Sequence, residues 1–68
     1  MTLQEIKNAL SENKRVFHHH KGYEVFTGFY DDGDQWWNIT CLQNDHTIGL
    51  TWIDGITMNG KEEDFFIG

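Results

Sequence analysis

Apolar and polar side chains alternate along residues 35–53, and this alternation constrains the fold more than any other feature of the chain. A period of two residues is typical of a β-strand with one buried face. Asn44-Asp45, in the middle of the stretch, suits a two-residue hairpin turn. In that register the buried face pairs Cys41 with Ile48, Ile39 with Leu50 and Trp37 with Trp52. The sequence therefore predicts antiparallel strands at about 35–43 and 46–53.

A second turn signal, Asp54-Gly55, follows directly. A two-residue turn there pairs Trp52 with Thr57 and Ile53 with Ile56, and adds a short strand at about 56–58. Residues 61–64 are charged and form a solvated loop, whereas the stretch from Phe65 to Ile67 is too apolar to stay in water. We expect a strand at about 65–67 to dock on the sheet.

The acidic segment 31–34 joins the central strand to the one before it. Gly33 suits the left-handed position of a type I turn followed by a G1 bulge. With that bulge, the facing pairs are Val25 with Ile39 and Thr27 with Trp37. A four-residue loop without the bulge would shift the register by one residue and bring Phe26 into the core. We favour the bulge, with a strand at about 23–30, because it keeps Val25 on the side of the helix.

Three consecutive histidines, residues 18–20, lie in an internal stretch with a strand pattern. The pattern predicts a first hairpin with a strand at about 14–20 and Lys21-Gly22 as its turn. His18 and His20 then share one face, about 7 Å apart, and a metal site would also need His46 and a carboxylate to converge on them. A histidine run without such partners is only compositional, so we predict no metal and no cofactor.

The N-terminal residues have the pattern of a helix. Thr2 and Glu5 fit a capping box, which places the start of the helix at Leu3. Leu3, Ile6 and Leu10 recur at helical spacing and form one apolar stripe. Asn13 is suited to a left-handed residue after the helix, so we expect the helix at about 3–12.

These elements predict one α+β domain over residues 1–68, with the helix packed on a strongly twisted five- or six-stranded antiparallel meander. Such a sheet can curl into a small SH3-like or OB-like barrel. A core of this size contributes only about 3–5 kcal/mol, and Cys41 is the only cysteine, which excludes an intramolecular disulfide. We therefore expect homo-oligomerisation to add stability.

The charge is acidic and uneven. Residues 1–22 hold four bases against two acids, or +2, and residues 23–68 hold one base against nine acids, or −8, for a net charge of −6. Binding of nucleic acid through phosphates is therefore not expected, and a basic protein partner or mimicry of nucleic acid is favoured. The chain has neither a membrane-spanning run nor a signal-peptide pattern, so we expect a cytoplasmic protein that does not bind membranes.

No residue pattern indicates catalysis. Cys41 lies on the expected core face, where a thiol is inert, and the acids of 31–34 and 62–64 lie in solvated turns. The glycines have no phosphate-loop spacing. We predict that the chain is not an enzyme.

An excess of aromatic side chains remains on the sheet face that points away from the helix. If they stay exposed, they form a patch that binds a protein partner. The alternative is that the apolar C-terminal tail covers them, or that curling of the sheet buries both faces. The candidate partner-binding residues are Trp36 first, then Tyr30 and Phe26, with Phe17 and His19.

The chain resembles small uncharacterised phage and prophage proteins in several stretches. These are the opening helix and residues 23–25, 48–52, 54–55, 57, 59–60 and 62–66. The shared motifs are turns and core positions, so the resemblance concerns the fold and assigns no site residues. It implies a setting in which short acidic proteins act on host factors by binding, for instance as inhibitors of defence or transcription machinery.

Three functions follow from the sequence. The first is a non-enzymatic phage-derived protein that binds a host protein, or itself, through the aromatic face. The second is an oligomer that sequesters a small ligand such as a nucleotide. The third is an acidic nucleic-acid mimic, which requires that segments 31–34 and 62–64 lie on the same side of the fold.

Overall fold

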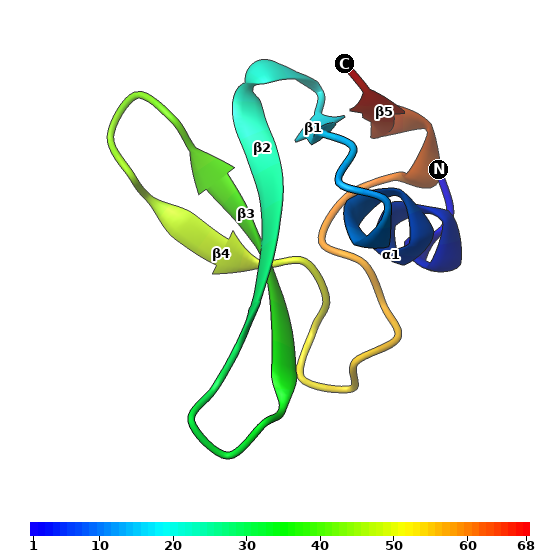
Figure 1. The fold of residues 1–68 in the computed structure, drawn as a ribbon. Helices are drawn as coiled ribbons and strands as arrows, with labels where there is room; N and C mark the ends of the chain where they lie inside the picture. The colour runs from blue at the N-terminus through cyan, green and yellow to red at the C-terminus, as the bar shows by residue number, and fades with distance from the viewer.

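A computed structural model, which describes all residues from 1 to 68, shows one helix and a five-stranded antiparallel sheet (Figure 1). The strands lie in the order β4-β3-β2-β1-β5. β4 and β5 are the two edges of the sheet, which is therefore open and not closed into the expected barrel. The elements are α1 (Leu3–Ser11), β1 (Val16–His18), β2 (His20–Phe29), β3 (Gln35–Cys41), β4 (Thr47–Gly49), the 3-10 turn η1 (Glu62–Asp64) and β5 (Phe65–Ile67).

α1 begins with the predicted capping box. The backbone N–H of Glu5 donates to Thr2 Oγ1 at 3.1 Å, and the backbone N–H of Thr2 donates to Glu5 Oε1 at 2.8 Å. The helix ends one residue earlier than predicted, and Asn13 adopts the expected left-handed conformation with a φ of 62°. α1 is neither long enough nor apolar enough to cross a bilayer.

The core lies between α1 and the sheet. It comprises Ile6, Ala9, Val16, Val25, Ile39, Leu50 and Phe65. Full burial of one large aliphatic side chain contributes about 1.5–3 kcal/mol. The apolar stripe of the helix and the inward face of the strands therefore meet as the sequence predicts.

The hairpin of β2 and β3 has the predicted bulged register. Val25 pairs with Ile39 and Thr27 pairs with Trp37. Tyr30 and Gly33 close the turn: the N–H of Tyr30 donates to the carbonyl of Asp34 at 2.7 Å, and the N–H of Gly33 donates to that of Tyr30 at 3.0 Å. Gly33 has a φ of 92°, as the G1 bulge requires.

The first hairpin turns at a different place from the predicted Lys21-Gly22. Val16 and Val25 lie on the same side of the sheet, as predicted, but they pair directly, whereas the predicted turn would place Val16 opposite Thr27. The chain reverses at His19, whose φ is 69°, after a bulge between Phe17 and His18. The predicted turn residues instead lie in β2, where the Gly22 carbonyl accepts from the Leu42 N–H at 2.8 Å. One left-handed residue and the bulge shorten the reversal, so the turn moves toward the N-terminus.

The hairpin of β3 and β4 is shifted by two residues from the predicted register. Ile39 pairs with Ile48 rather than Leu50, and the Leu50 N–H donates to the Trp37 carbonyl at 3.0 Å. The turn is a four-residue loop, residues 42–45, not the two-residue turn at Asn44-Asp45. A shift of two residues leaves each side chain on the predicted face of the sheet. Of the six residues predicted to be buried on that face, however, only Ile39 and Leu50 are buried, and Ile48 and Trp52 are exposed.

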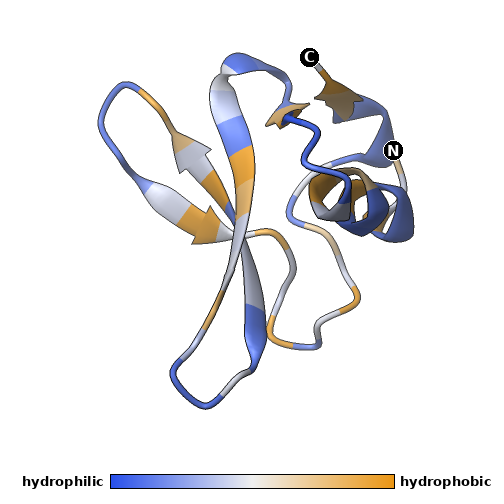
Figure 2. Ribbon diagram, viewed as in Figure 1, coloured by the Kyte–Doolittle hydropathy of each residue, from blue (hydrophilic) through white to orange (hydrophobic).

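The segment between β4 and β5 turns at Asp54-Gly55, as predicted. The Trp52 N–H donates to the Thr57 carbonyl at 2.8 Å, which is the expected register. The strand expected at 56–58 is reduced to a single bridge between Thr51 and Met58. Hydrophobic positions recur along this segment where it bends away from the sheet (Figure 2).

The C-terminal residues dock on the sheet, as predicted, and form its edge strand. β5 pairs antiparallel with β1, with Phe66 opposite Phe17 and Phe65 opposite His18. Phe65 is buried in the core. The C-terminal residues, far from β1 in the sequence, thus form the edge of the sheet that lies beside α1 (Figure 1).

Candidate functional site

The five predicted partner-binding residues do not form one patch. Trp36 and Tyr30 line a cavity at one end of the sheet, and His19 lines a second cavity with other histidines. Phe26 is partly exposed on β2, and Phe17 is buried at 3% exposure. The structure therefore brings together only the first two of the five.

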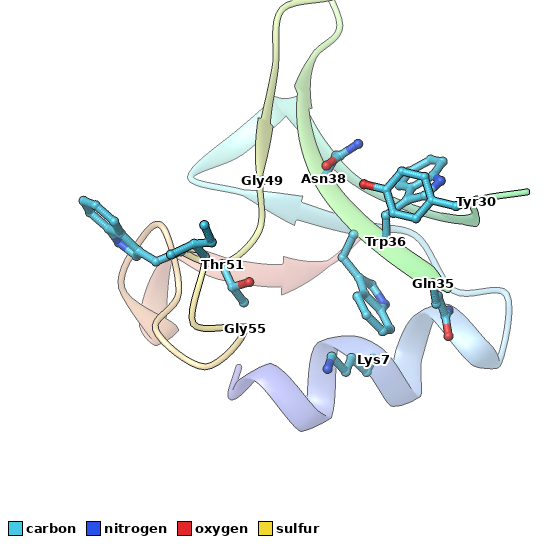
Figure 3. Close-up of a pocket in the computed structure, with 11 residues that line it drawn as sticks. Lys7, Tyr30, Gln35, Trp36, Asn38, Gly49, Thr51 and Gly55 are labelled. Atoms are coloured by element: carbon cyan, nitrogen blue, oxygen red, sulfur yellow. The ribbon is translucent and has the colours of Figure 1, made fainter. Parts of the chain in front are cut away.

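The first cavity has a volume of about 310 Å³ and is lined by all three tryptophans of the chain. We call it the tryptophan cavity. Figure 3 shows Tyr30, Trp36 and Gln35 on one side, Thr51 and Gly55 on the other, and Lys7 of α1 nearby. The tryptophans are Trp36, Trp37 and Trp52, and Ile53 lies beside them in the lining.

The cavity forms where β3 lacks a strand neighbour. β4 ends at Gly49, opposite Asn38, so the edge of β3 from Gln35 to Trp37 is not covered by a β-strand. Neighbouring side chains of β3 point to opposite faces, but both Trp36 and Trp37 adjoin this open edge. The segment after β4 then bends back and adds Trp52 as the far wall.

Trp36 is fixed by its neighbours on β2. Its ring lies over Gly28, where an added Cβ would be only 2.4 Å from Trp36 Cζ2, so glycine permits this close contact. The Trp36 carbonyl accepts from Thr27 Oγ1 at 2.8 Å, and Gln35 Nε2 donates to the same hydroxyl at 2.8 Å. This wall of the cavity is therefore preorganised.

The Lys7 side chain lies over the ring of Trp37, the second tryptophan of the cavity. Its Nζ lies 4.1 Å from the ring centroid of Trp37, a cation–π geometry. The ion pairs of the chain are Lys14 with Glu12 and Arg15 with Glu24, so the ammonium of Lys7 has no carboxylate partner. An aromatic face thus holds this positive charge.

The third wall is an exposed apolar turn. Trp52 is 61% exposed, Ile56 is 76% exposed and Ile53 is fully exposed. The Asp54 carboxylate accepts from the N–H groups of Ile56 and Thr57 at 2.8 and 2.9 Å and from Thr57 Oγ1 at 2.7 Å. These hydrogen bonds lower the pKa of Asp54 and hold the turn in one shape.

An acidic loop borders the cavity. Asp31, Asp32 and Asp34 lie between Tyr30 and Gln35, both of which line the cavity. Asp32 Oδ1 accepts from the Asp34 N–H at 2.9 Å, and none of the three carboxylates forms an ion pair. The loop that connects these two lining residues therefore carries negative charge that no base of the chain neutralises.

Phe17 belongs to a separate cluster beneath the C-terminal strand. Its ring stacks on Phe66 with a centroid distance of 5.8 Å, and Arg15 Cζ lies 5.1 Å from its centroid. Arg15 also binds Glu24 through two hydrogen bonds of 2.7 and 3.1 Å. The tail thus covers this part of the second face, which is the alternative that the sequence left open.

His19 lines the second cavity, of about 290 Å³, together with His18, His46 and Tyr23 over Ile39 and Ile48. His18 Nε2 is buried without a hydrogen-bond partner. Burial lowers the pKa of the His18 imidazole. Charge on the neighbouring His19 and His20 lowers the pKa of His18 further, whereas Asp64 opposes the shift. No group of three or more His, Cys, Asp or Glu side chains is arranged to hold a metal ion.

Sequence reasoning missed two walls of the tryptophan cavity and Lys7. It placed Trp37 and Trp52 on the core face, paired with each other and apart from Trp36. The signal that was present is the number of tryptophans in so short a chain, all near strand ends.

Comparison of the chain with protein-family models, curated proteins and solved structures finds no match.

Proposed function

We propose that this chain is a non-enzymatic binding protein, phage- or prophage-derived, that acts on a host protein by direct interaction. The contact surface is the tryptophan cavity with the turn from Trp52 to Ile56. The observation that carries the proposal is the exposure of large apolar side chains around one cavity, with Tyr30 and Trp52 each 61% exposed.

This surface has the composition of an interaction site. Tryptophan and tyrosine dominate the binding energy of protein interfaces, because each buries a large area with few rotatable bonds. The exposed side chains of Trp52, Ile53 and Ile56 lie on a single turn that Asp54 holds in place. A partner would therefore meet a preformed apolar surface at little cost in conformational entropy.

The groups that line the cavity favour binding over catalysis. Besides the indole N–H groups, its polar side-chain groups are an ammonium, two carboxamides and two hydroxyls, from Lys7, Gln35, Asn38, Thr51 and Tyr30. The lining contains no histidine, carboxylate or thiol that could serve as a base or nucleophile beside them.

A nucleotide-sequestering oligomer is the second candidate, because Lys7 and the three indoles could contact a phosphate and a base. The acidic loop beside the cavity disfavours it, since a phosphate would approach three unpaired carboxylates. Nucleic-acid mimicry is not proposed, because the β2–β3 loop and the residues before β5 lie at opposite ends of the molecule (Figure 1).

Affinity capture from a bacterial lysate tests the proposed function. Trp52→Ala removes an exposed wall of the cavity, and Leu42→Ala is the matched control, since Leu42 is 42% exposed in the β3–β4 loop. We expect wild type and Leu42→Ala to capture the same protein and Trp52→Ala to lose it. Equal capture by all three would refute the proposed surface, and addition of ATP to the lysate examines the second candidate.

A further inference from the structure

We infer that the partner is basic and that the tryptophan cavity receives one of its arginine side chains. This inference rests on the proposed function and specifies the chemistry of the partner. Three features of the cavity carry it: unpaired negative charge at its rim, free aromatic faces inside it, and a size that suits one long side chain.

The rim carries negative charge that the chain does not neutralise. Asp31, Asp32 and Asp34 connect two lining residues, and Asp54 lies between two others, Ile53 and Gly55. None of these four carboxylates takes part in an ion pair. Lys7 is the only base in the lining, so the cavity and its rim attract cations and repel anions.

The chain itself shows what its aromatic faces bind. Lys7 lies over Trp37 at 4.1 Å, and Arg15 lies over Phe17 at 5.1 Å. Trp52 and Tyr30 are exposed, whereas Trp37 is half-buried, and neither Trp52 nor Tyr30 has such a cation over its ring. Their faces are therefore open to a cation from a partner.

The guanidinium group fits the cavity better than an ammonium. It is planar, stacks on indole and phenol rings, and donates several hydrogen bonds in one plane. Asn38 and Gln35 place carboxamides in the lining, and Gln35 uses its Nε2 on Thr27, which leaves its carbonyl oxygen to accept. A volume of about 310 Å³ is at the lower end for ligand sites, which suits one side chain.

Tryptophan fluorescence can test this inference directly, because every tryptophan of the chain lines the cavity. The probes are a short peptide with two arginines, the same peptide with neutral citrulline at both positions, and ATP. At low ionic strength and at probe concentrations up to roughly 5 mM, we expect that only the arginine peptide produces a saturable change in tryptophan emission. An equal response to the citrulline peptide, or a response to ATP alone, would overturn the inference.

Charge variants separate the rim from the rest of the acidic surface. The triple variant Asp31→Asn, Asp32→Asn and Asp34→Asn should weaken binding of the arginine peptide about tenfold. The control, Glu62→Gln with Glu63→Gln, alters the opposite end of the molecule and should leave binding unchanged. An equal loss in both variants would show a general charge effect and would refute a specific rim.

The two proposals can fail separately. If lysate capture depends on Trp52 but the wild-type chain gives no response to the arginine peptide and the triple variant captures normally, the basic partner is wrong and the binding surface stands. If capture is independent of Trp52, the proposed function is wrong whatever the peptide shows.

Discussion

The ammonium nitrogen of Lys7 lies 4.1 Å from the centroid of the Trp37 ring, inside a cavity bordered by carboxylates that have no basic partner. The helix thus supplies one cation to a site that carries more negative charge than this cation neutralises. This relationship links the packing of α1 to the binding that we propose.

Lys7→Met should therefore have two opposite effects. Loss of the cation–π contact should lower the free energy of unfolding by about 0.5–1 kcal/mol. Removal of a positive charge from the cavity should tighten binding of the arginine peptide. Urea denaturation and the fluorescence titration measure the two effects. Weaker peptide binding in a folded variant would contradict the expected electrostatics.

Gly28→Ala should disturb the wall formed by Trp36. The new Cβ would lie 2.4 Å from Trp36 Cζ2, so the indole must move, at a cost of about 1–3 kcal/mol in the free energy of unfolding. Gly22→Ala is the matched control on β2. Its Cβ would meet only the exposed His20 ring, which can rotate away with loss of one exposed hydrogen bond, from the Gly22 N–H to His20 Nδ1 at 2.9 Å. An equal loss in the free energy of unfolding of both variants would show that the contact between Gly28 and the Trp36 ring contributes no more to stability than the contact at Gly22.

Thr2→Ala should remove one half of the capping box. The Glu5 N–H would lose its acceptor at 3.1 Å, and the free energy of unfolding should fall by about 1 kcal/mol. Gln4→Ala is the control, because its exposed side chain bonds only to Asn8 on the helix surface. Denaturant unfolding of both variants measures the difference, and an equal effect would argue against the cap.

The stability of the fold should fall as the pH drops below about 6.5. Burial lowers the pKa of His18 in the folded state below its value in the unfolded chain, so the unfolded chain binds more protons in this range. The stability that depends on neutral His18 is fully present above the pKa that this group has in the unfolded chain. It is lost as the pH falls toward the pKa of His18 in the folded protein. His18→Phe should flatten the decline between pH 7 and pH 5, and an unchanged slope would assign it to other groups.

Local patterns allowed much of the fold to be predicted. The capping box depends on Thr2 and Glu5 alone, and the register of β2 and β3 depends on Gly33 and the alternation beside it. The predicted β3–β4 register was wrong by two residues because both registers place the same side chains on the same face of the sheet, so alternation cannot choose between them. The turn at His19 was missed because a positive φ is uncommon for any residue other than glycine, and Lys21-Gly22 was the stronger turn signal in the sequence.

The site could be predicted only in part. Trp36 and Tyr30 were recognised because they lie on the face away from the helix. Trp37 and Trp52 were assigned to the core because strand alternation predicts the face of the sheet on which a side chain lies. Alternation does not predict where the neighbouring strand ends, and that end decides whether the side chain is covered. The cavity exists because β4 stops at Gly49 and the following turn returns beside β3, which is a long-range arrangement.

Quantitative capture from a bacterial lysate tests the central claim most directly, with wild type, Trp52→Ala and Leu42→Ala compared by mass spectrometry. The proposed surface predicts one protein enriched about equally by wild type and Leu42→Ala, and reduced at least tenfold by Trp52→Ala, as expected for an interface tryptophan. Equal enrichment by all three chains would contradict the account.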